Sequence, residues 1–194
     1  IGYQTTSGSV ISGSGSVLCG GSGNFIKLDT ANENPSCLVG GVNNEATGAG
    51  SFLGGGYGNI GSGNYAVLCG GQGNTTRHNG GFTNDRAGSY LTIVNGNNNR
   101  IERRSGGKPN YGAILNGNTN YIGNTLDYGL IINGSSNNVT SGDYATIING
   151  TGNSSTGVRS SIINGSSNIA SGQDSYVLGG TQNTASHLSS KVIT

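Results

Sequence analysis

The sequence is poor in the residues on which many functional classes depend. Charged residues make up 9% of the 194, and the formal net charge is +1. A chain this neutral lacks both the basic excess that attracts nucleic acid and the acidic excess that attracts a basic partner. Its longest apolar runs are also far below the ~20 residues that a membrane-spanning helix needs. We therefore expect no nucleic-acid partner and no membrane insertion by this segment.

Motifs for catalysis and metal binding are equally scarce. The chain has two histidines, His78 and His187, which lie far apart, and it contains no HExxH, CxxC or glycine-rich phosphate-binding motif. Asp85 and Glu102, which lie in neighbouring insertions, are the carboxylates considered as a catalytic pair, and the sequence alone does not place them together. Three cysteines are interpreted as small buried apolar residues: Cys19, Cys37 and Cys69. We expect a protein without enzymatic activity, cofactor or metal.

What the sequence has instead is a short internal repeat. An asparagine stands three residues after an anchor glycine and six after an aliphatic residue in ten successive copies. These asparagines are Asn24, Asn44, Asn59, Asn74, Asn99, Asn120, Asn137, Asn153, Asn168 and Asn183. Successive anchor glycines are 15 to 25 residues apart, so the unit is fifteen residues with insertions. Such a unit is too short for a helix and has room for two short strands and two turns.

This repeat predicts an all-β, parallel β-roll, or β-solenoid, of about ten 15-residue coils in one domain over residues 1–194. Glycine at both ends of a coil supplies a positive φ or allows a close approach of neighbouring backbones. Coils stacked about 4.8 Å apart place equivalent residues above one another. The ten asparagines are then expected to form a hydrogen-bonded ladder between coils. Glycine-rich chains are often disordered, but the periodic apolar residues favour an ordered fold.

The strand before each anchor glycine is apolar on both faces. Its aliphatic residue three places before the glycine, such as Ile147, is expected to face the coil interior, because alternate strand residues point to opposite sides. The residues two and four places before the glycine then point outward, and they include Ile132, Ile148 and Ile163. An apolar stripe of this length is larger than a soluble monomer usually exposes. We expect a homo-oligomer in which this face meets another subunit.

Five tyrosines stand six residues before an anchor glycine and are in phase with the outward columns: Tyr65, Tyr90, Tyr111, Tyr128 and Tyr144. A column of this kind stacks its aromatic faces while each hydroxyl reaches water or a partner chain. We interpret the column as packing at the rim of an interface, rather than as a binding platform.

The segment from Ser161 to Gly180, with the sequence SIINGSSNIASGQDSYVLGG, resembles the head repeats of trimeric autotransporter adhesins, the YadA-like or haemagglutinin-type repeats. The resemblance extends from about Ser16 to Ser186. It implies a left-handed roll, a homotrimer, an extracellular location and attachment to a host surface receptor or glycan. The repeats also resemble those of tail or surface fibres of viruses, so the resemblance leaves a cell surface and a virion surface both open.

Two departures separate this chain from the adhesin pattern. The unit is slightly longer and carries asparagine where that family commonly has serine or alanine, and the sequence contains no neck, coiled-coil stalk or membrane-anchor segment. Because Ile1 already lies in repeat-like sequence and no signal peptide heads the chain, we expect it to be a processed or excised piece.

A second resemblance competes with the first. Segments such as 137–142 and 12–17, rich in Asn, Ser, Val and Gly, are similar to β-roll ice-binding proteins. That resemblance implies a flat, regular array of short hydroxyl and methyl side chains. The outward columns here mix Cys, Phe, Leu, Ile, Thr and Tyr and make an uneven face. Ice binding is therefore the alternative, with a self-assembling extracellular filament as a further one.

The period breaks at three insertions, which we predict to be loops at about 25–36, 75–92 and 100–112. Insertions in solenoids often form the binding face. The second and third contain the basic residues Arg77, His78, Arg100, Arg103, Arg104 and Lys108. These six are the candidates for binding an anionic glycan or phosphate group, and a solvated rim without a ligand is the competing interpretation.

Overall fold

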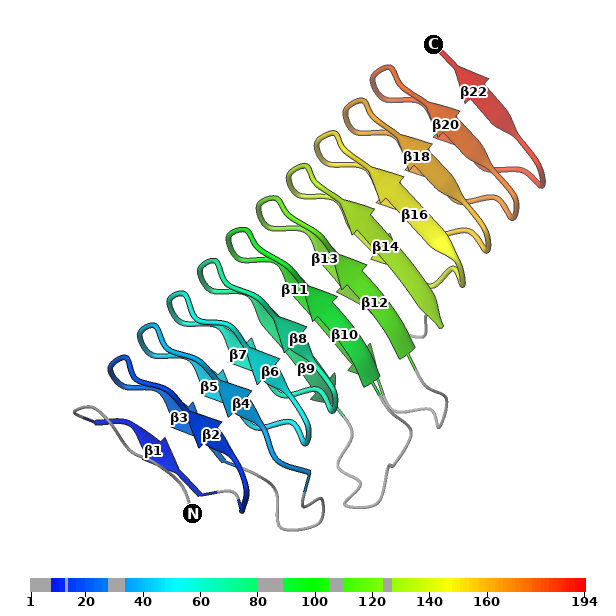
Figure 1. Ribbon diagram of the computed structural model, residues 1–194. Coiled ribbons are helices and arrows are strands. Elements are labelled where there is room, and N and C mark those ends of the chain that lie inside the picture. The colour runs from blue at the N-terminus through cyan, green and yellow to red at the C-terminus, as the bar shows by residue number, and fades with distance from the viewer. Residues whose placement is uncertain (1–7, 13, 28–33, 80–88, 105–109, 124–126) are drawn as a thin grey trace.

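The computed structural model describes residues 8–12, 14–27, 34–79, 89–104, 110–123 and 127–194. These residues form no helix and 22 short strands, which pair in two parallel sheets of eleven strands each. Successive strands alternate between the sheets, and Figure 1 shows the resulting coils stacked in one row, with the two chain termini at opposite ends. The predicted all-β parallel β-solenoid is confirmed.

We call the two sheets sheet A and sheet B. Sheet A contains β1 (Val10–Ile11), β3 (Phe25–Ile26), β5 (Glu45–Ala46), β7 (Ile60–Gly61), β9 (Thr75–Asn79), β11 (Arg100–Arg104), β13 (Tyr121–Gly123), β15 (Asn138–Thr140), β17 (Ser154–Ser155), β19 (Ile169–Ala170) and β21 (Thr184–Ala185). Sheet B contains β2 (Val17–Leu18), β4 (Cys37–Leu38), β6 (Phe52–Leu53), β8 (Val67–Leu68), β10 (Ser89–Ile93), β12 (Asn110–Ile114), β14 (Tyr128–Ile132), β16 (Ala145–Ile148), β18 (Ser161–Ile163), β20 (Tyr176–Leu178) and β22 (Lys191–Ile193).

The core is a thin apolar layer between the two sheets. Sheet B contributes the aliphatic column three residues before each anchor glycine, and all ten members are buried: Leu18, Leu38, Leu53, Leu68, Ile93, Ile114, Ile131, Ile147, Ile162 and Val177. Sheet A contributes a second inward column. Its side chains differ in size, from small ones such as Ala46 to large ones such as Ile101. Large residues of one sheet face small residues of the other: a Cβ on Gly112 would lie 2.9 Å from Cγ2 of Ile101. This complementarity lets one backbone shape hold coils of different composition.

The turn from sheet B to sheet A carries the asparagine ladder. The backbone N–H of Asn120 donates to Oδ1 of Asn99 (3.0 Å), and its Nδ2 donates to the carbonyl of Gly134 (2.9 Å). Its own Oδ1 accepts from the backbone N–H of Asn137 (3.1 Å). The same pattern recurs along the rod, with Oδ1 of each ladder asparagine accepting from the next one's N–H. Each buried asparagine therefore links its own coil to both neighbours.

The anchor glycines of this turn have no room for a side chain. Gly150 has a φ of 93°, and a Cβ there would lie 2.3 Å from the carbonyl oxygen of Gly165 in the next coil. At the opposite turn, glycine is required by the close approach of the next coil and not by a positive φ. Gly157 does not have a positive φ, but a Cβ would lie 2.1 Å from the carbonyl oxygen of Gly172.

The predicted loops at 25–36, 75–92 and 100–112 are wrong in part, because strands occupy their ends. β9 pairs with β11 over all five residues, from Thr75 opposite Arg100 to Asn79 opposite Arg104. β10 likewise pairs with β12 over five residues. The strand extensions of these two coils lie beside each other, so each extended strand has a partner of equal length. Residues 80–88 and 105–109, like 28–33 of the first predicted loop, lie outside the described residues.

Candidate interaction surfaces

The outer face of sheet B is apolar over most of the rod, with Thr92, Thr146, Ser161 and Lys191 as its polar members. Two outward columns flank the buried aliphatic one, and their exposed or partly exposed members include Val17, Val39, Phe52, Val94, Leu115, Leu130, Ile132, Ile148, Ile163 and Leu178. The register keeps equivalent residues opposite one another, as with Ile132 and Ile148, and then Ile148 and Ile163. The result is a flat apolar strip on one side of the solenoid.

A stack of five tyrosines borders this strip. We call Tyr65, Tyr90, Tyr111, Tyr128 and Tyr144 the tyrosine ladder. Successive ring centroids are 5.5, 5.1, 4.9 and 4.6 Å apart, and the rings are within 16° of parallel. Tyr65 and Tyr144 hold this position with φ values of 55° and 61°, a conformation that L-residues adopt at a cost. Arg159 and Asp174, further along the same column, have similar φ values, so the turn rather than the ring imposes this conformation.

The ladder forms one wall of an open groove of about 500 Å³. Four tyrosines, from Tyr90 to Tyr144, lie along it, and the outward residues Thr92, Ala113, Leu130 and Thr146 also line it. The groove follows the axis of the rod across four coils. It is therefore an elongated apolar trough rather than an enclosed pocket.

The expectation of three buried cysteines is wrong. Cys19 and Cys69 are exposed and Cys37 is partly exposed. All three belong to outward columns of sheet B, which the single chain does not cover. Partial burial raises the pKa of the Cys37 thiol above its ordinary value, and the neighbouring Cys19 adds to this effect.

The outer face of sheet A is more polar and less regular. Over the last regular coils its outward residues are mainly short hydroxyl side chains, such as Thr140, Ser154 and Thr156. Isolated apolar side chains occur among them, and Ile169 is the largest in this part of the sheet. This face has no continuous apolar column among the described residues.

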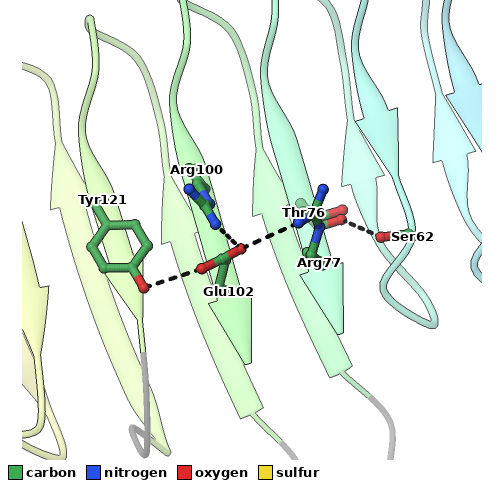
Figure 2. Close-up of polar contacts among 6 residues, drawn as sticks. All are labelled: Ser62, Thr76, Arg77, Arg100, Glu102 and Tyr121. Carbon is green, nitrogen blue, oxygen red and sulfur yellow. Dashed lines mark hydrogen bonds and ion pairs between the residues drawn. The ribbon is translucent and has the colours of Figure 1, made fainter. Parts of the chain in front are cut away.

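Four side chains on the outer face of sheet A form a polar cluster (Figure 2). Arg100 donates a hydrogen bond to Oε1 of Glu102, and Tyr121 donates to Oε2 at 3.3 Å. Nη1 of Arg77 lies 4.0 Å from the same carboxylate, and the Arg100 guanidinium lies 5.8 Å from the centroid of the Tyr121 ring. The Glu102 side chain is only 12% exposed, whereas about half of each arginine side chain remains exposed.

The structure therefore brings part of the predicted basic site together. Arg77 and Arg100 converge on Glu102 from strands rather than from loops. His78, Arg103 and Arg104 belong to the same paired strands, where His78 is opposite Arg103, and their side chains lie outside the described part of the structure. Lys108 lies outside it altogether, as does Asp85, the other carboxylate of the possible catalytic pair.

Sequence reasoning missed Glu102 and Tyr121 as members of this cluster, and it missed an ion pair near the C-terminal end. Arg159 contacts the Asp174 carboxylate with Nε and with Nη2, the latter at 2.8 Å. These hydrogen bonds lower the pKa of Asp174 below its ordinary value. The sequence contained a signal for this pair, because Arg159 and Asp174 are one 15-residue unit apart and follow Tyr144 in the column of the five tyrosines.

A second asparagine column lies on the exposed side of the ladder turn. Asn95, Asn116, Asn133, Asn149 and Asn164 immediately precede anchor glycines in successive coils, and all are exposed. Ladder asparagines such as Asn120 and Asn153, four residues further on, are buried. One turn therefore holds two asparagine columns with opposite environments.

Comparison with protein-family models and with curated proteins found no match for this chain. Among the described residues, no helix is long and apolar enough to cross a membrane, and no three His, Cys, Asp or Glu side chains gather at a point where they could hold a metal ion.

Proposed function

We propose that this chain is a rod-shaped, non-enzymatic domain of an extracellular attachment fibre, located on a cell or virion surface, and that it works as a homotrimer. The observation that carries the proposal is the apolar outer face of sheet B. A soluble monomer rarely exposes a continuous apolar patch of this extent. The rigid stack of coils suits a spacer that holds contact sites away from a surface.

The dimensions of the face support a stable contact between copies. Eleven strands about 4.8 Å apart make it about 48 Å long, and its two outward columns together with the bordering column that holds the tyrosine ladder make it about 15 Å wide, on the order of 700 Å². Standard protein interfaces bury about 800 Å² on each partner. Three copies that turn sheet B toward a common axis would cover the strip on every chain.

The polar cluster of sheet A supports attachment, because sheet A would remain on the outside of such a trimer. Arg77 and Arg100 keep about half of their side chains exposed while Glu102 orients them. Guanidinium groups held in this way can bind a carboxylate, sulfate or phosphate through paired hydrogen bonds. We therefore propose an anionic glycan or another acidic group of a host surface receptor as the ligand.

The oligomer is tested with two isoleucines of equal exposure on opposite faces. Ile163 on sheet B is 39% exposed and Ile169 on sheet A is 41% exposed. Light scattering after size-exclusion chromatography should give a mass of about 58 kDa for the parent, since three chains of 19.4 kDa make 3 × 19.4. Ile163→Asp should release folded monomers and Ile169→Asp should not. A monomeric parent, or equal effects of both changes, would contradict the proposal.

Attachment is tested separately on sulfated and uncharged glycans. A variant with Arg77, Arg100, Arg103 and Arg104 changed to serine should lose binding to the sulfated glycan, and binding by the parent should weaken as salt shortens the ~8 Å screening length. The matched control is Lys191→Ser on sheet B. Equal binding by the parent and the fourfold variant would show that the glycan binds elsewhere on the rod.

Ice binding is the second candidate function, and the exposed turn favours it. Asn133, Asn149 and Asn164 present amides at one position of successive coils, about 4.8 Å apart. Such an array could match a repeating lattice. The measurement is the growth of ice crystals in the presence of the chain. Growth at the rate of buffer alone would exclude this function.

A further inference from the structure

We infer that the tyrosine ladder is a site of oxidative cross-linking, in which neighbouring tyrosines of one chain, above all Tyr128 and Tyr144, join as dityrosine under an extracellular peroxidase or another one-electron oxidant. The inference does not depend on the proposed fibre function. It rests on the spacing of the rings, their exposure and the composition of the chain.

The ladder holds neighbouring phenol rings close together at all times, whereas free tyrosines in solution come this close only when they collide. Tyr128 and Tyr144 have the shortest separation, with ring centroids 4.6 Å apart. The register fixes this pair, because Gly129 and Ala145, the residues that follow them, are opposite each other in sheet B. Two reacting groups held together in this way react as if at very high concentration.

Exposure gives the oxidant access and gives the last ring room to move. Tyr144 is 56% exposed and has a tyrosine neighbour on one side only, since the next coil places Arg159 in this column. Its ring can therefore tilt and bring an ortho carbon toward the Tyr128 ring. The groove beside Tyr90, Tyr111, Tyr128 and Tyr144 leaves this wall of the ladder open to a small oxidant.

The chain lacks two side chains that would compete with tyrosine for the oxidant. The full sequence contains no tryptophan and no methionine. Methionine in particular would consume peroxide by forming its sulfoxide. The three cysteines lie in the first coils, and neither Tyr128 nor Tyr144 shares a coil with them. An oxidant that reaches the middle of the rod therefore reacts with the tyrosine phenols.

The reaction balances without any group from the protein besides the two phenols. The oxidant removes one electron and one proton from each ring, which gives two phenoxyl radicals. A carbon–carbon bond forms between the Cε atoms ortho to the two oxygens, and the hydrogens on these carbons leave as protons while both oxygens regain protons. The pair loses two hydrogen atoms in total, and one hydrogen peroxide is reduced to two waters.

The test uses the whole chain with its thiols blocked, a haem peroxidase and limiting hydrogen peroxide. A protease that cleaves before aspartate separates the rings, because Asp127, Asp143 and Asp174 place Tyr128 on fragment 127–142 and Tyr144 on fragment 143–173. Mass spectrometry should find these two fragments joined with a loss of two hydrogen atoms. The intact chain should show the blue fluorescence of dityrosine and still run as one chain on a denaturing gel.

Two variants locate the reaction. Tyr144→Phe keeps a ring for stacking but has no phenol, so the joined fragments should disappear. Tyr57→Phe is the control, because Tyr57 is similarly exposed and lies at the turn, outside the ladder. Oxidation should raise the melting temperature of the parent and of Tyr57→Phe, since a bond between coils restrains the unfolded chain, and should not raise that of Tyr144→Phe.

Three results would overturn the inference. One is an equal yield of the joined fragments from chain unfolded in denaturant, where the ladder is dispersed. Another is cross-linking that joins only separate chains. The third is an equal loss of the product in Tyr57→Phe and Tyr144→Phe, which would show that exposure rather than stacking selects the tyrosines.

Discussion

The two outer faces of the rod differ although the same coils build both. In one coil, β18 of sheet B points Ile163 outward beside Ile148 and Leu178, whereas β19 of sheet A points Ile169 outward beside Ser154 and Thr184. The backbone is the same parallel ladder in both sheets. Coil stacking therefore constrains the inward columns and leaves the outward columns free to carry different surfaces.

The largest expected effect is a difference in the free energy of unfolding between an inward and an outward substitution on one strand. Ile147 is buried in the core and Ile148, the next residue, points outward. Ile147→Ala should lower the free energy of unfolding by about 3 kcal/mol through lost burial and a cavity. Ile148→Ala should lower that of the isolated chain by less than about 1 kcal/mol. Urea unfolding of both variants measures the difference, and similar losses would show that the two sides are not distinct.

The next effect concerns the turn that both faces share. Asn120→Ala should cost about 2–3 kcal/mol, because it leaves the buried N–H of Asn137 without its acceptor and removes one of the two hydrogen bonds to the carbonyl of Gly134. Asn116→Ala is the matched control in the same turn, where the side chain is exposed, and it should cost less than about 0.5 kcal/mol. Thermal unfolding followed by circular dichroism gives both values. Equal costs would show that the ladder hydrogen bonds add little.

A smaller effect of opposite sign is expected inside sheet A. Thr76 is buried, and its hydroxyl has no hydrogen-bond partner among the described residues. Thr76→Val keeps the shape and removes the unpaired hydroxyl, so it should stabilise the chain by about 1 kcal/mol. Thr75→Val, one residue away on the outward side, should change stability little. A destabilising Thr76→Val would mean that the hydroxyl is paired in solution.

The smallest effect concerns the exposed Arg159–Asp174 pair. Arg159 lowers the pKa of Asp174, so the stabilisation is present above the ordinary aspartate pKa and is lost as pH falls through the lowered value. The melting temperature of Asp174→Asn should therefore lie slightly below that of the parent at neutral pH and equal it in strong acid. High salt should also close the gap, because the pair is exposed to solvent. If the difference in melting temperature between the parent and Asp174→Asn persisted in strong acid, the charge of Asp174 would not be its cause.

Much of the coil architecture could be predicted because its causes are local and repeated. The constant spacing from Ile147 to Gly150 to Asn153 specifies a buried strand residue, a tight turn and a ladder position. The tyrosine ladder followed from the same register, since each ring is six residues before an anchor glycine. Where the unit kept its length, sequence position alone gave the neighbour in the next coil.

The candidate polar cluster was missed because the predicted loops began at Thr75 and Arg100, where strands begin. Arg77 and Glu102 are 25 residues apart, but each stands six residues after an anchor glycine, and they oppose each other in the register. Predicting loops there assumed that an insertion leaves the stack. Whether it does depends on whether the next coil offers a strand of equal length, which no single repeat reveals.

The sequence by itself determined the period, the inward columns and the ladder, because each depends on residues within one unit and on the strand spacing common to all sheets. Only the tertiary structure decided which asparagine column of the shared turn is buried, which side chains meet at Glu102, and that the ends of two insertions continue the sheets. These features depend on contacts between side chains of neighbouring coils. Spacing along the chain does not specify those contacts.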